Sequence, residues 1–298
     1  LEFVRVTEAA AMAASQAVGH GNKNEADGLA VKAIREVFSE INIQGEIVIG
    51  EGELDEAPML YTGEIVGQQI DSSTPQVDIA VDPLEGNSLV AKGAAGAIAV
   101  LAVADKGGLL AAPDMYMDKI AVGPQAKGQI SLEKSPTANV KAVAKALHKK
   151  LHDLTVVVLD RPRHTELIKE LRATGVMIRL ITDGDVLPAV STAFPNSGID
   201  IVMGTGGAPE GVLAAAALKC LGGDMCGRLN PDTTNAEMCR DLCLKVDCKH
   251  LTLNDLAPGD DIIFSMTGIT ESSLLKGVTY AGNDRINTHT LALRSRTG

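Results

Sequence analysis

The sequence of 298 residues predicts an α/β protein built from layered sheets and helices. Short apolar strands lead repeatedly into polar or glycine-containing turns and then into helical patterns, which is the order of elements in α/β folds. Aromatic residues make up only 2% of the chain and Trp is absent, so Ala, Val, Ile and Leu must fill the core. The length suffices for one large domain or for two subdomains with an extensive core.

Two helices are predicted at the start of the chain, over residues 4–18 and 24–38. Both stretches place apolar residues at helical spacing, and the break at residues 20–22 separates them. The second helix carries Asp27 in its first turn. An acid at a helix start is often only a favourable partner for the helix dipole, so Asp27 alone indicates no site.

A short apolar strand is predicted over residues 46–50, and an acidic run follows it directly. The run contains four carboxylates: Glu51, Glu53, Asp55 and Glu56. Acids this close together repel one another unless cations or solvent intervene. A solvated loop is the simplest interpretation, but a position straight after a buried strand also suits ligands of a cation, and both interpretations stay open.

The run AVDPLEGNSL at residues 80–89 is the most informative segment for function. A strand over residues 77–82 alternates apolar and acidic side chains, and we expect Pro83 to end it, because proline has no N–H and disfavours a helical conformation before it. Asp82 and Glu85 then share one turn. Two hard oxygen ligands so placed suit Mg²⁺ or Mn²⁺, with a plain acidic loop as the alternative. Asn87, just after Gly86, is unexpected in such a turn.

Three strand-to-helix junctions follow, and two late strands close the sequence, at residues 260–266 and 290–293. The junction strands are expected at residues 154–159, 176–182 and 199–203. Ligand sites of open α/β sheets lie beyond the carboxyl ends of the strands, so these three turns should converge. We expect residues 204–207 to form a glycine-rich loop before Pro209, which suits phosphate binding or only close packing.

Charged side chains occupy these turns. Arg161 and Arg163 could clamp a phosphate through paired N–H donors, although arginine at a strand end is more often a surface ion-pair partner. We expect His164 to cap or solvate its helix, and Glu210 to cap a helix or reach a metal.

A mild shift in composition at residues 128–135 predicts two subdomains. They are a metal-binding N-terminal subdomain, residues 1–130, and a C-terminal α/β subdomain, residues 131–298, that contributes to the substrate site.

Composition argues against several classes of partner and location. The formal net charge is -11 and no sustained basic run occurs, so we expect neither a nucleic acid nor an anionic membrane as partner. The longest apolar stretches are too short for a bilayer, and the first residues do not resemble a signal peptide, so we expect a cytoplasmic protein.

The five cysteines lie within residues 220–248 without a C-x-x-C pair. Reduced structural thiols are the favoured interpretation, and a zinc site is the alternative.

Several motifs occurring in a fixed order together resemble one family, class II fructose-1,6-bisphosphatase. They are GNKNEADG, VIGEGELDEAPMLY, VDIAVDPLEG, APDMYMDKI, DRPRH, TDGDV and GTGGAPEGV, followed by IIFSMTGIT. The resemblance implies an α-β-α-β-α layered sandwich of the sugar phosphatase and inositol monophosphatase type, with two subdomains. It also implies hydrolysis of the 1-phosphate of fructose 1,6-bisphosphate in gluconeogenesis, and a homodimer or homotetramer. Some photosynthetic members also accept sedoheptulose 1,7-bisphosphate.

The resemblance implies a site with two or more divalent ions, Mn²⁺ or Mg²⁺. Asp27 and Glu51 match ligands of one ion, and Asp82, Glu85 and Glu210 match ligands of another. The phosphorylated sugar would contact Glu85, Gly86, Asn87, Tyr116, Arg161, Pro162, Arg163, Asp183, Gly184, Asp185 and Gly207. Arg161 stands where the family often has Lys, a change that keeps the charge but alters its geometry.

Asn87 stands where the family has a Thr that helps to deprotonate the attacking water. An amide can donate a hydrogen bond but cannot pass on a proton, so we expect weakened catalysis. The predicted catalytic residues are Asn87, Asp55 and Glu85, and Ser88 could replace the hydroxyl only if the turn were rebuilt. The alternatives are a phosphatase of inositol or nucleotide phosphates and a catalytically silent phosphosugar-binding protein. Acids kept at every ligand position argue against a purely structural role.

Overall fold

The computed structural model describes residues 1–51, 60–68, 70–71, 73–231 and 236–297. Asp55, with Glu53 and Glu56, lies outside the described residues. The chain forms two compact units: Leu1–Ala111 with Gly259–Gly298, and Ala112–Pro258. The sequence predicts one boundary after residue 130, whereas the first unit stops at Ala111 and resumes at Gly259, because two C-terminal strands join its sheet.

The first unit contains a mixed sheet of six strands in the order β14-β11-β4-β3-β1-β2. Strands β1 and β3 are parallel, and the other neighbours are antiparallel. A separate hairpin joins β12 (Thr279–Tyr280) to β13 (Ile286–Asn287). The strands of the sheet are β1 (Gln44–Ile49), β2 (Ile65–Val66), β3 (Gln76–Glu85), β4 (Ile98–Asp105), β11 (Ile262–Gly268) and β14 (Thr290–Arg294).

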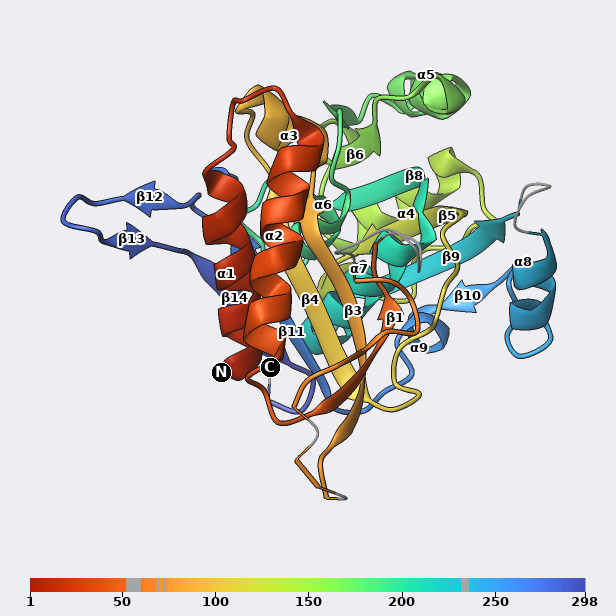
Figure 1. The fold of residues 1–298 in the computed structure, drawn as a ribbon. Helices are drawn as coiled ribbons and strands as arrows, with labels where there is room; N and C mark the ends of the chain where they lie inside the picture. Colours follow the sequence, from red (N-terminus) through yellow and green to blue (C-terminus); the bar gives the residue numbers. More distant parts are fainter. Residues whose placement is uncertain (52–59, 69, 72, 232–235, 298) are drawn as a thin grey trace. The chain divides into compact units, whose positions relative to one another are not determined.

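Helices α1 (Glu2–Ser15) and α2 (Lys23–Phe38) lie side by side against this sheet, and the short α3 (Asn87–Lys92) packs on α2 (Figure 1). Both helices predicted near the N-terminus are confirmed. The core between helices and sheet consists almost entirely of Ala, Val, Ile and Leu, with Phe38 as its buried aromatic residue. The composition therefore predicted the packing correctly.

Strand β3 continues past the point where we expected it to end. Asp82 of β3 pairs with Val100 of β4, and the next pair joins Glu85 to Ile98. Between these pairs β3 therefore contains one residue more than β4. This bulge removes the need for an N–H at Pro83, because the extra residue of a bulge stays outside the ladder. The prediction that Pro83 ends the strand is wrong. The strand ends instead at Glu85, before Gly86 with its positive φ of 97°.

The second unit contains another mixed sheet of six strands, in the order β10-β9-β5-β8-β6-β7. Strand β6 is parallel to both β7 and β8, and β5 is antiparallel to both β8 and β9. The strands are β5 (Tyr116–Val122), β6 (Thr155–Leu159), β7 (Met177–Ile181), β8 (Ile201–Gly207), β9 (Asp224–Asn230) and β10 (Leu251–Thr252). Two units with mixed sheets and helices confirm the α/β class.

The helices of the second unit connect these strands. They are α4 (Pro136–Ala146), α5 (Thr165–Thr174), α6 (Val186–Ser191), α7 (Ala208–Leu221), α8 (Ala236–Cys243) and α9 (Leu253–Leu256), with 3-10 turns η1 (Pro124–Ala126), η2 (Leu151–Asp153) and η3 (Pro162–His164). In the part of the chain that the structure describes, no helix combines the length and the apolar character that a membrane crossing requires.

The glycine-rich segment before α7 differs from the sequence prediction. Gly204, Gly206 and Gly207 belong to β8, and the residues from Gly204 to Gly207 pair with β5 from Lys119 back to Tyr116. The prediction of a loop at residues 204–207 is therefore wrong. Local sequence could not show this, because the pairing partner β5 lies far away in the chain.

Candidate active site

In the first unit, Asp27 of α2 and Glu51 at the end of β1 lie within contact of each other. Their side chains share a hydrogen bond, although burial has the larger effect and raises the pKa of Asp27. The Oδ1 atom of Asp27 is buried and has no hydrogen-bond partner among the residues described. Two adjoining carboxyl groups with an unsatisfied buried oxygen fit a divalent cation, which prefers such oxygen ligands.

Gly50 explains how Glu51 is held at this place. A side chain at Gly50 would put its Cβ 1.9 Å from the carbonyl oxygen of Leu60. The N–H of Glu51 donates to that same oxygen over 2.8 Å. The backbone at Leu60 therefore crosses directly over the strand end, which only glycine permits, and it fixes the backbone of Glu51.

The end of β3 brings Asp82 and Glu85 to the same edge of the sheet as Glu51. Ile49 of β1 pairs in parallel with Ala80 of β3, so Glu51 and Asp82 each follow that pair by two residues. Neighbouring strands are about 4.8 Å apart. Asp82 Oδ1 accepts a hydrogen bond of 3.0 Å from the N–H of Leu84, which orients the carboxylate.

Asn87 begins α3, directly after the left-handed Gly86, and Glu85 before them is buried. The Oδ1 atom of Asn87 is also buried without a hydrogen-bond partner in the described ranges. A buried polar oxygen in this state costs about 1–3 kcal/mol unless a ligand satisfies it. Asp27 and Glu51 adjoin each other, and Asp82, Glu85 and Asn87 follow at the end of β3; that these side chains together hold divalent ions stays a prediction.

In the second unit, the carboxyl ends of β6, β7 and β8 meet at one edge, because β6 runs parallel to both neighbours. The turns that follow these strands carry the predicted substrate residues Arg161, Pro162 and Arg163; Asp183, Gly184 and Asp185; and Gly207 at the end of β8. The predicted convergence of the three turns is confirmed within this unit. The contacts of each residue with a substrate stay predictions.

The guanidinium group of Arg163 is fixed over an exposed aromatic ring. Its Cζ lies 4.6 Å from the ring centroid of Tyr116, and its Nε and Nη2 donate to the carbonyl oxygen of Thr205 over 3.1 and 2.8 Å. These bonds use a neutral acceptor and leave the positive charge available to an anion. Arg161 is oriented by a bond of 3.1 Å from its Nη1 to the carbonyl oxygen of Asp160.

Lys119 is the functional candidate that the sequence interpretation missed. Only 5% of its side chain is exposed, and its Nζ lies 2.9 Å from Asp185 and 2.9 Å from the carbonyl oxygen of Gly207. Burial raises the pKa of Glu210, while Lys119 opposes that shift and Asp185 adds to it. The strand alternation could have revealed Lys119, since Met117, Lys119 and Ala121 share the buried face of β5.

Gly206 and Gly207 make room for these buried carboxylates. A Cβ at Gly206 would lie 2.3 Å from Asp185 Oδ2, and one at Gly207 would lie 1.9 Å from Glu210 Oε2. Of the two interpretations of this glycine run, the structure therefore favours close packing.

His164 is buried and joins two strands of this unit. Its Nε2 accepts a hydrogen bond of 2.7 Å from the N–H of Thr205, so its Nδ1 carries the proton and donates to the carbonyl oxygen of Leu159 over 2.7 Å. The side chain does not cap its helix and is not solvated, so both parts of the expectation for His164 are wrong. Both ring nitrogens are engaged in positioning the ends of β6 and β8.

Comparison with known proteins gives one consistent result. The family model "Bacterial fructose-1,6-bisphosphatase, glpX-encoded" matches residues 1–298. The chain is 48% identical over 309 aligned positions to fructose-1,6-bisphosphatase 1 class 2 of Escherichia coli K12, covering 99% of this chain and 91% of that protein. The class 2 enzymes of Escherichia coli O6:H1 and Shigella flexneri match with the same identity and coverage.

Proposed function

Because the chain belongs to the glpX-encoded family of bacterial fructose-1,6-bisphosphatases, we propose that it hydrolyses the 1-phosphate of fructose 1,6-bisphosphate. The products are fructose 6-phosphate and inorganic phosphate, so the chain is a phosphoric monoester hydrolase of gluconeogenesis. The observation that carries this proposal is the row of carboxylates at the ends of β1 and β3, with a buried oxygen of Asp27 that lacks a hydrogen-bond partner among the described residues.

Divalent ions are the second part of the proposal. Asp27 and Glu51 would hold one ion, and Asp82, Glu85 and Glu210 would hold another, as the resemblance implies. Glu210 belongs to the second unit, and its part in the site stays a prediction. When bound, Mn²⁺ or Mg²⁺ would neutralise phosphate charge and lower the pKa of water. The choice between these two ions is not decided by the donor set, since carboxylate oxygens suit both.

The chain's own cations would hold the anionic substrate. Arg163 is fixed by Thr205 and Tyr116 with its charge uncompensated by these contacts, which suits a phosphate group. Lys119 has a different part, because its Nζ is occupied by Asp185 and Gly207. It would hold the carboxylate of Asp185 in place and reduce the repulsion between Asp185 and Glu210.

The side chain of Asn87 determines the turnover rate that we expect for the hydrolysis. Its amide would orient a water molecule through a hydrogen bond but would not remove a proton from it. General base catalysis typically contributes about 10²–10⁴-fold to a rate, so a Thr hydroxyl that takes part in proton removal should raise turnover within that range. Asn87 is only one of the predicted substrate contacts, so substrate binding should change little.

The test is phosphate release from fructose 1,6-bisphosphate with Mn²⁺ or Mg²⁺, for the native chain and for Asn87→Thr. We expect both proteins to bind substrate, with kcat about 10²–10⁴-fold higher for Asn87→Thr and a similar KM. Asn254→Thr, at an exposed position, is the matched control and should behave as the native chain. Equal and substantial rates for the native chain and Asn87→Thr would show that Asn87 is harmless. No metal-dependent binding by either would refute the bisphosphatase proposal.

The remaining properties implied by the family can be tested separately. We expect a homodimer or homotetramer, which light scattering after size-exclusion chromatography would measure. A cytoplasmic location and activity towards sedoheptulose 1,7-bisphosphate also stay predictions. Activity towards inositol or nucleotide phosphates that exceeds activity towards fructose 1,6-bisphosphate would favour the alternative of a related phosphatase.

A further inference from the structure

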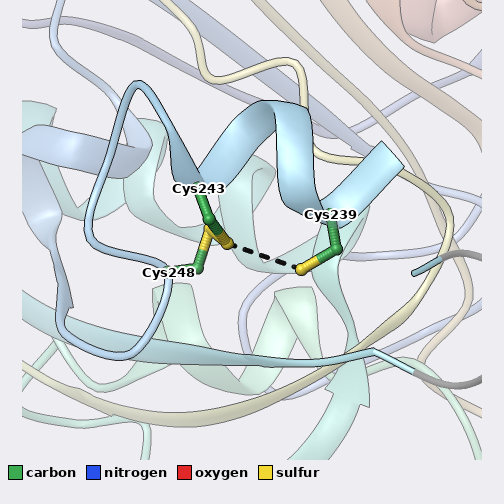
Figure 2. A group of neighbouring side chains, drawn as sticks. All are labelled: Cys239, Cys243 and Cys248. Carbon is green, nitrogen blue, oxygen red and sulfur yellow. Dashed lines mark hydrogen bonds between the residues drawn. A yellow bond between two sulfur atoms is a disulfide. The ribbon is translucent and has the colours of Figure 1, made fainter. Parts of the chain in front are cut away.

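Three cysteine sulfurs gather where α8 ends, in a region that the proposed hydrolysis does not use. Cys239 and Cys243 lie on α8, and Cys248 lies in the turn that follows (Figure 2). Cys243 and Cys248 form a disulfide, and the Sγ of Cys239 lies 3.5 Å from the Sγ of Cys243. The sequence expectation of reduced thiols is therefore wrong for Cys243 and Cys248.

The geometry gives Cys243 two alternative bonding partners. Its Cα lies 5.3 Å from the Cα of Cys248. Cys239 precedes it by four residues on the same face of the helix, where helix dimensions place the two Cα atoms about 6.2 Å apart. Disulfides span Cα separations of about 4.4–6.8 Å, a range that both pairs meet. They also need Cβ atoms about 3.5–4.5 Å apart, whereas residues four apart on a regular helix hold theirs about 5–6 Å apart, so the bond from Cys239 to Cys243 requires the last turn of α8, which ends at Cys243, to loosen.

Exposure distinguishes the three sulfurs. Cys243 is exposed, whereas Cys239 and Cys248 are buried. A reagent in solution therefore meets Cys243 first, with a buried sulfur close to it on either side. Cys226 contrasts with this group, because burial raises the pKa of its thiol to about 11 and keeps it from forming the reactive thiolate.

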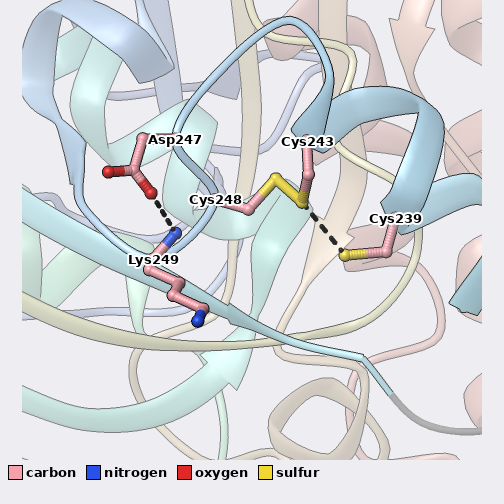
Figure 3. The surroundings of a disulfide bond; sticks show 5 residues. All are labelled: Cys239, Cys243, Asp247, Cys248 and Lys249. Carbon is pink, nitrogen blue, oxygen red and sulfur yellow. Dashed lines mark hydrogen bonds between the residues drawn. A yellow bond between two sulfur atoms is a disulfide. The ribbon is translucent and has the colours of Figure 1, made fainter.

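The turn that carries Cys248 is fixed independently of the disulfide. The carbonyl oxygen of Cys248 accepts a hydrogen bond of 2.9 Å from the N–H of Leu229 in β9. Asp247 Oδ1 accepts one of 3.0 Å from the N–H of Lys249, on the other side of Cys248 (Figure 3). Cys248 would therefore stay near Cys243 after the disulfide opens, and the reaction would be reversible.

We propose that Cys239, Cys243 and Cys248 form a thiol–disulfide exchange site that accepts a small thiol at Cys243. In the first step the thiolate of the small thiol attacks Cys243 Sγ. A mixed disulfide forms, the bond from Cys243 to Cys248 breaks, and Cys248 leaves as a thiolate that takes up a proton.

In the second step the Cys239 thiolate attacks Cys243 Sγ. The bond from Cys239 to Cys243 forms, and the small thiol leaves unchanged. One disulfide is broken and one is made, so no net oxidation occurs. The exchange releases α8 from its covalent link to the turn held by β9.

Trypsin separates the three cysteines, which makes the test direct. Cleavage after Arg228, Arg240, Lys245 and Lys249 places each cysteine on its own peptide. The native chain is incubated with a mixture of reduced and oxidised glutathione, quenched with acid, alkylated, digested and analysed by mass spectrometry without reduction. We expect both linkages, Cys243 to Cys248 and Cys239 to Cys243, in the native chain.

Variants identify the part of each sulfur. In Cys248→Ser the linkage from Cys239 to Cys243 should become the main one. In the double variant Cys239→Ser with Cys248→Ser, glutathione should stay on Cys243 at least tenfold longer than in either single variant, because no neighbouring thiol can displace it. Cys226→Ser is the control and should leave both linkages unchanged, and circular dichroism checks that each variant is folded.

Two results would overturn the proposal. One is the absence of a linkage from Cys239 to Cys243 in the native chain. The other is an equal lifetime of bound glutathione in the double and single variants. The native chain is tested without any substitution, so the first result is informative even if a variant fails to fold. None of these measurements depends on phosphatase activity.

Discussion

Lys119→Met tests whether the buried cation of the second unit holds its carboxylates together. Methionine keeps the apolar stem of lysine but removes the charge and the donor. The Nζ of Lys119 lies 2.9 Å from both carboxylate oxygens of Asp185 and 2.9 Å from the carbonyl oxygen of Gly207. The substitution would leave Asp185 and Glu210 buried without this cation.

The expected loss is large for one substitution. Removing one partner of a buried ion pair costs about 3–5 kcal/mol in free energy of unfolding, because the remaining charge is left uncompensated. The side chains of Lys119 and Asp185 are 5% and 9% exposed, so solvent screens this pair little. We therefore expect Lys119→Met to lose about 3–5 kcal/mol.

The assay is urea unfolding in EDTA, followed by circular dichroism because the chain has no Trp. Lys169→Met is the matched control in the same unit. Its ion pair with Glu166 spans 3.6 Å, and both side chains are more than three-quarters exposed, at 77% and 83%. Such a pair contributes at most about 1 kcal/mol. A loss for Lys119→Met no greater than that of the control would refute the reasoning.

The pH dependence gives a second check on the same variant. Burial raises the pKa of Glu210, and Lys119 opposes that shift. A carboxyl with a raised pKa binds more protons in the folded than in the unfolded state, so its effect on stability becomes more favourable as pH falls. The difference between the native chain and Lys119→Met should therefore shrink from pH 8 to pH 5. A constant difference would mean that uncompensated carboxylates are not the cause.

Two further predictions concern the carboxylates themselves. Gly207→Ala places a methyl group 1.9 Å from Glu210 Oε2, so we expect a loss of about 1–3 kcal/mol and weaker Mn²⁺ binding, whereas Gly28→Ala, in open space on α2, should not destabilise the fold. Asp27→Asn should raise the melting temperature in EDTA at pH 7, because burial raises the pKa of Asp27 and the folded protein favours a neutral group. The same variant should bind Mn²⁺ at least tenfold more weakly by calorimetry. A lower melting temperature in EDTA, or unchanged Mn²⁺ affinity, would contradict the assignment of Asp27.

Elements whose signals are local could be predicted from the sequence. The periodicity of residues 4–18 and 24–38 predicted α1 and α2, and the apolar run before Asp160 predicted β6. The ends of β3 and β8 could not be predicted in this way. Strand β3 passes Pro83 because β4 accommodates a bulge, and β8 includes Gly204–Gly207 because β5 pairs with it. Both ends depend on a partner strand that local sequence does not identify.

The residues of the candidate site could likewise be predicted from the sequence only where their signals are local. Acids that follow an apolar strand indicated Glu51 and Asp82, since burial of such a strand fixes where its end must lie. Lys119 was missed because its burial is tolerable only beside Asp185, which is 66 residues away. The return of β11 and β14 to the first sheet was missed for the same reason, because strand order depends on contacts between distant segments.

Three buried side-chain oxygens of the first unit lack a hydrogen-bond partner among the described residues, and two of them, on Asp27 and Asn87, allow the effects on binding and on turnover to be told apart. Hydrogen bonding within the described residues satisfies neither Asp27 Oδ1 nor Asn87 Oδ1, and each costs about 1–3 kcal/mol unless a ligand meets it. A cation would satisfy the oxygen of Asp27, which is also next to Glu51. The amide oxygen of Asn87 can coordinate a cation or accept a hydrogen bond from water, but neither contact removes a proton. Metal and substrate binding should therefore persist in the native chain while catalysis stays slow, and a gain limited to kcat in Asn87→Thr would distinguish these two effects.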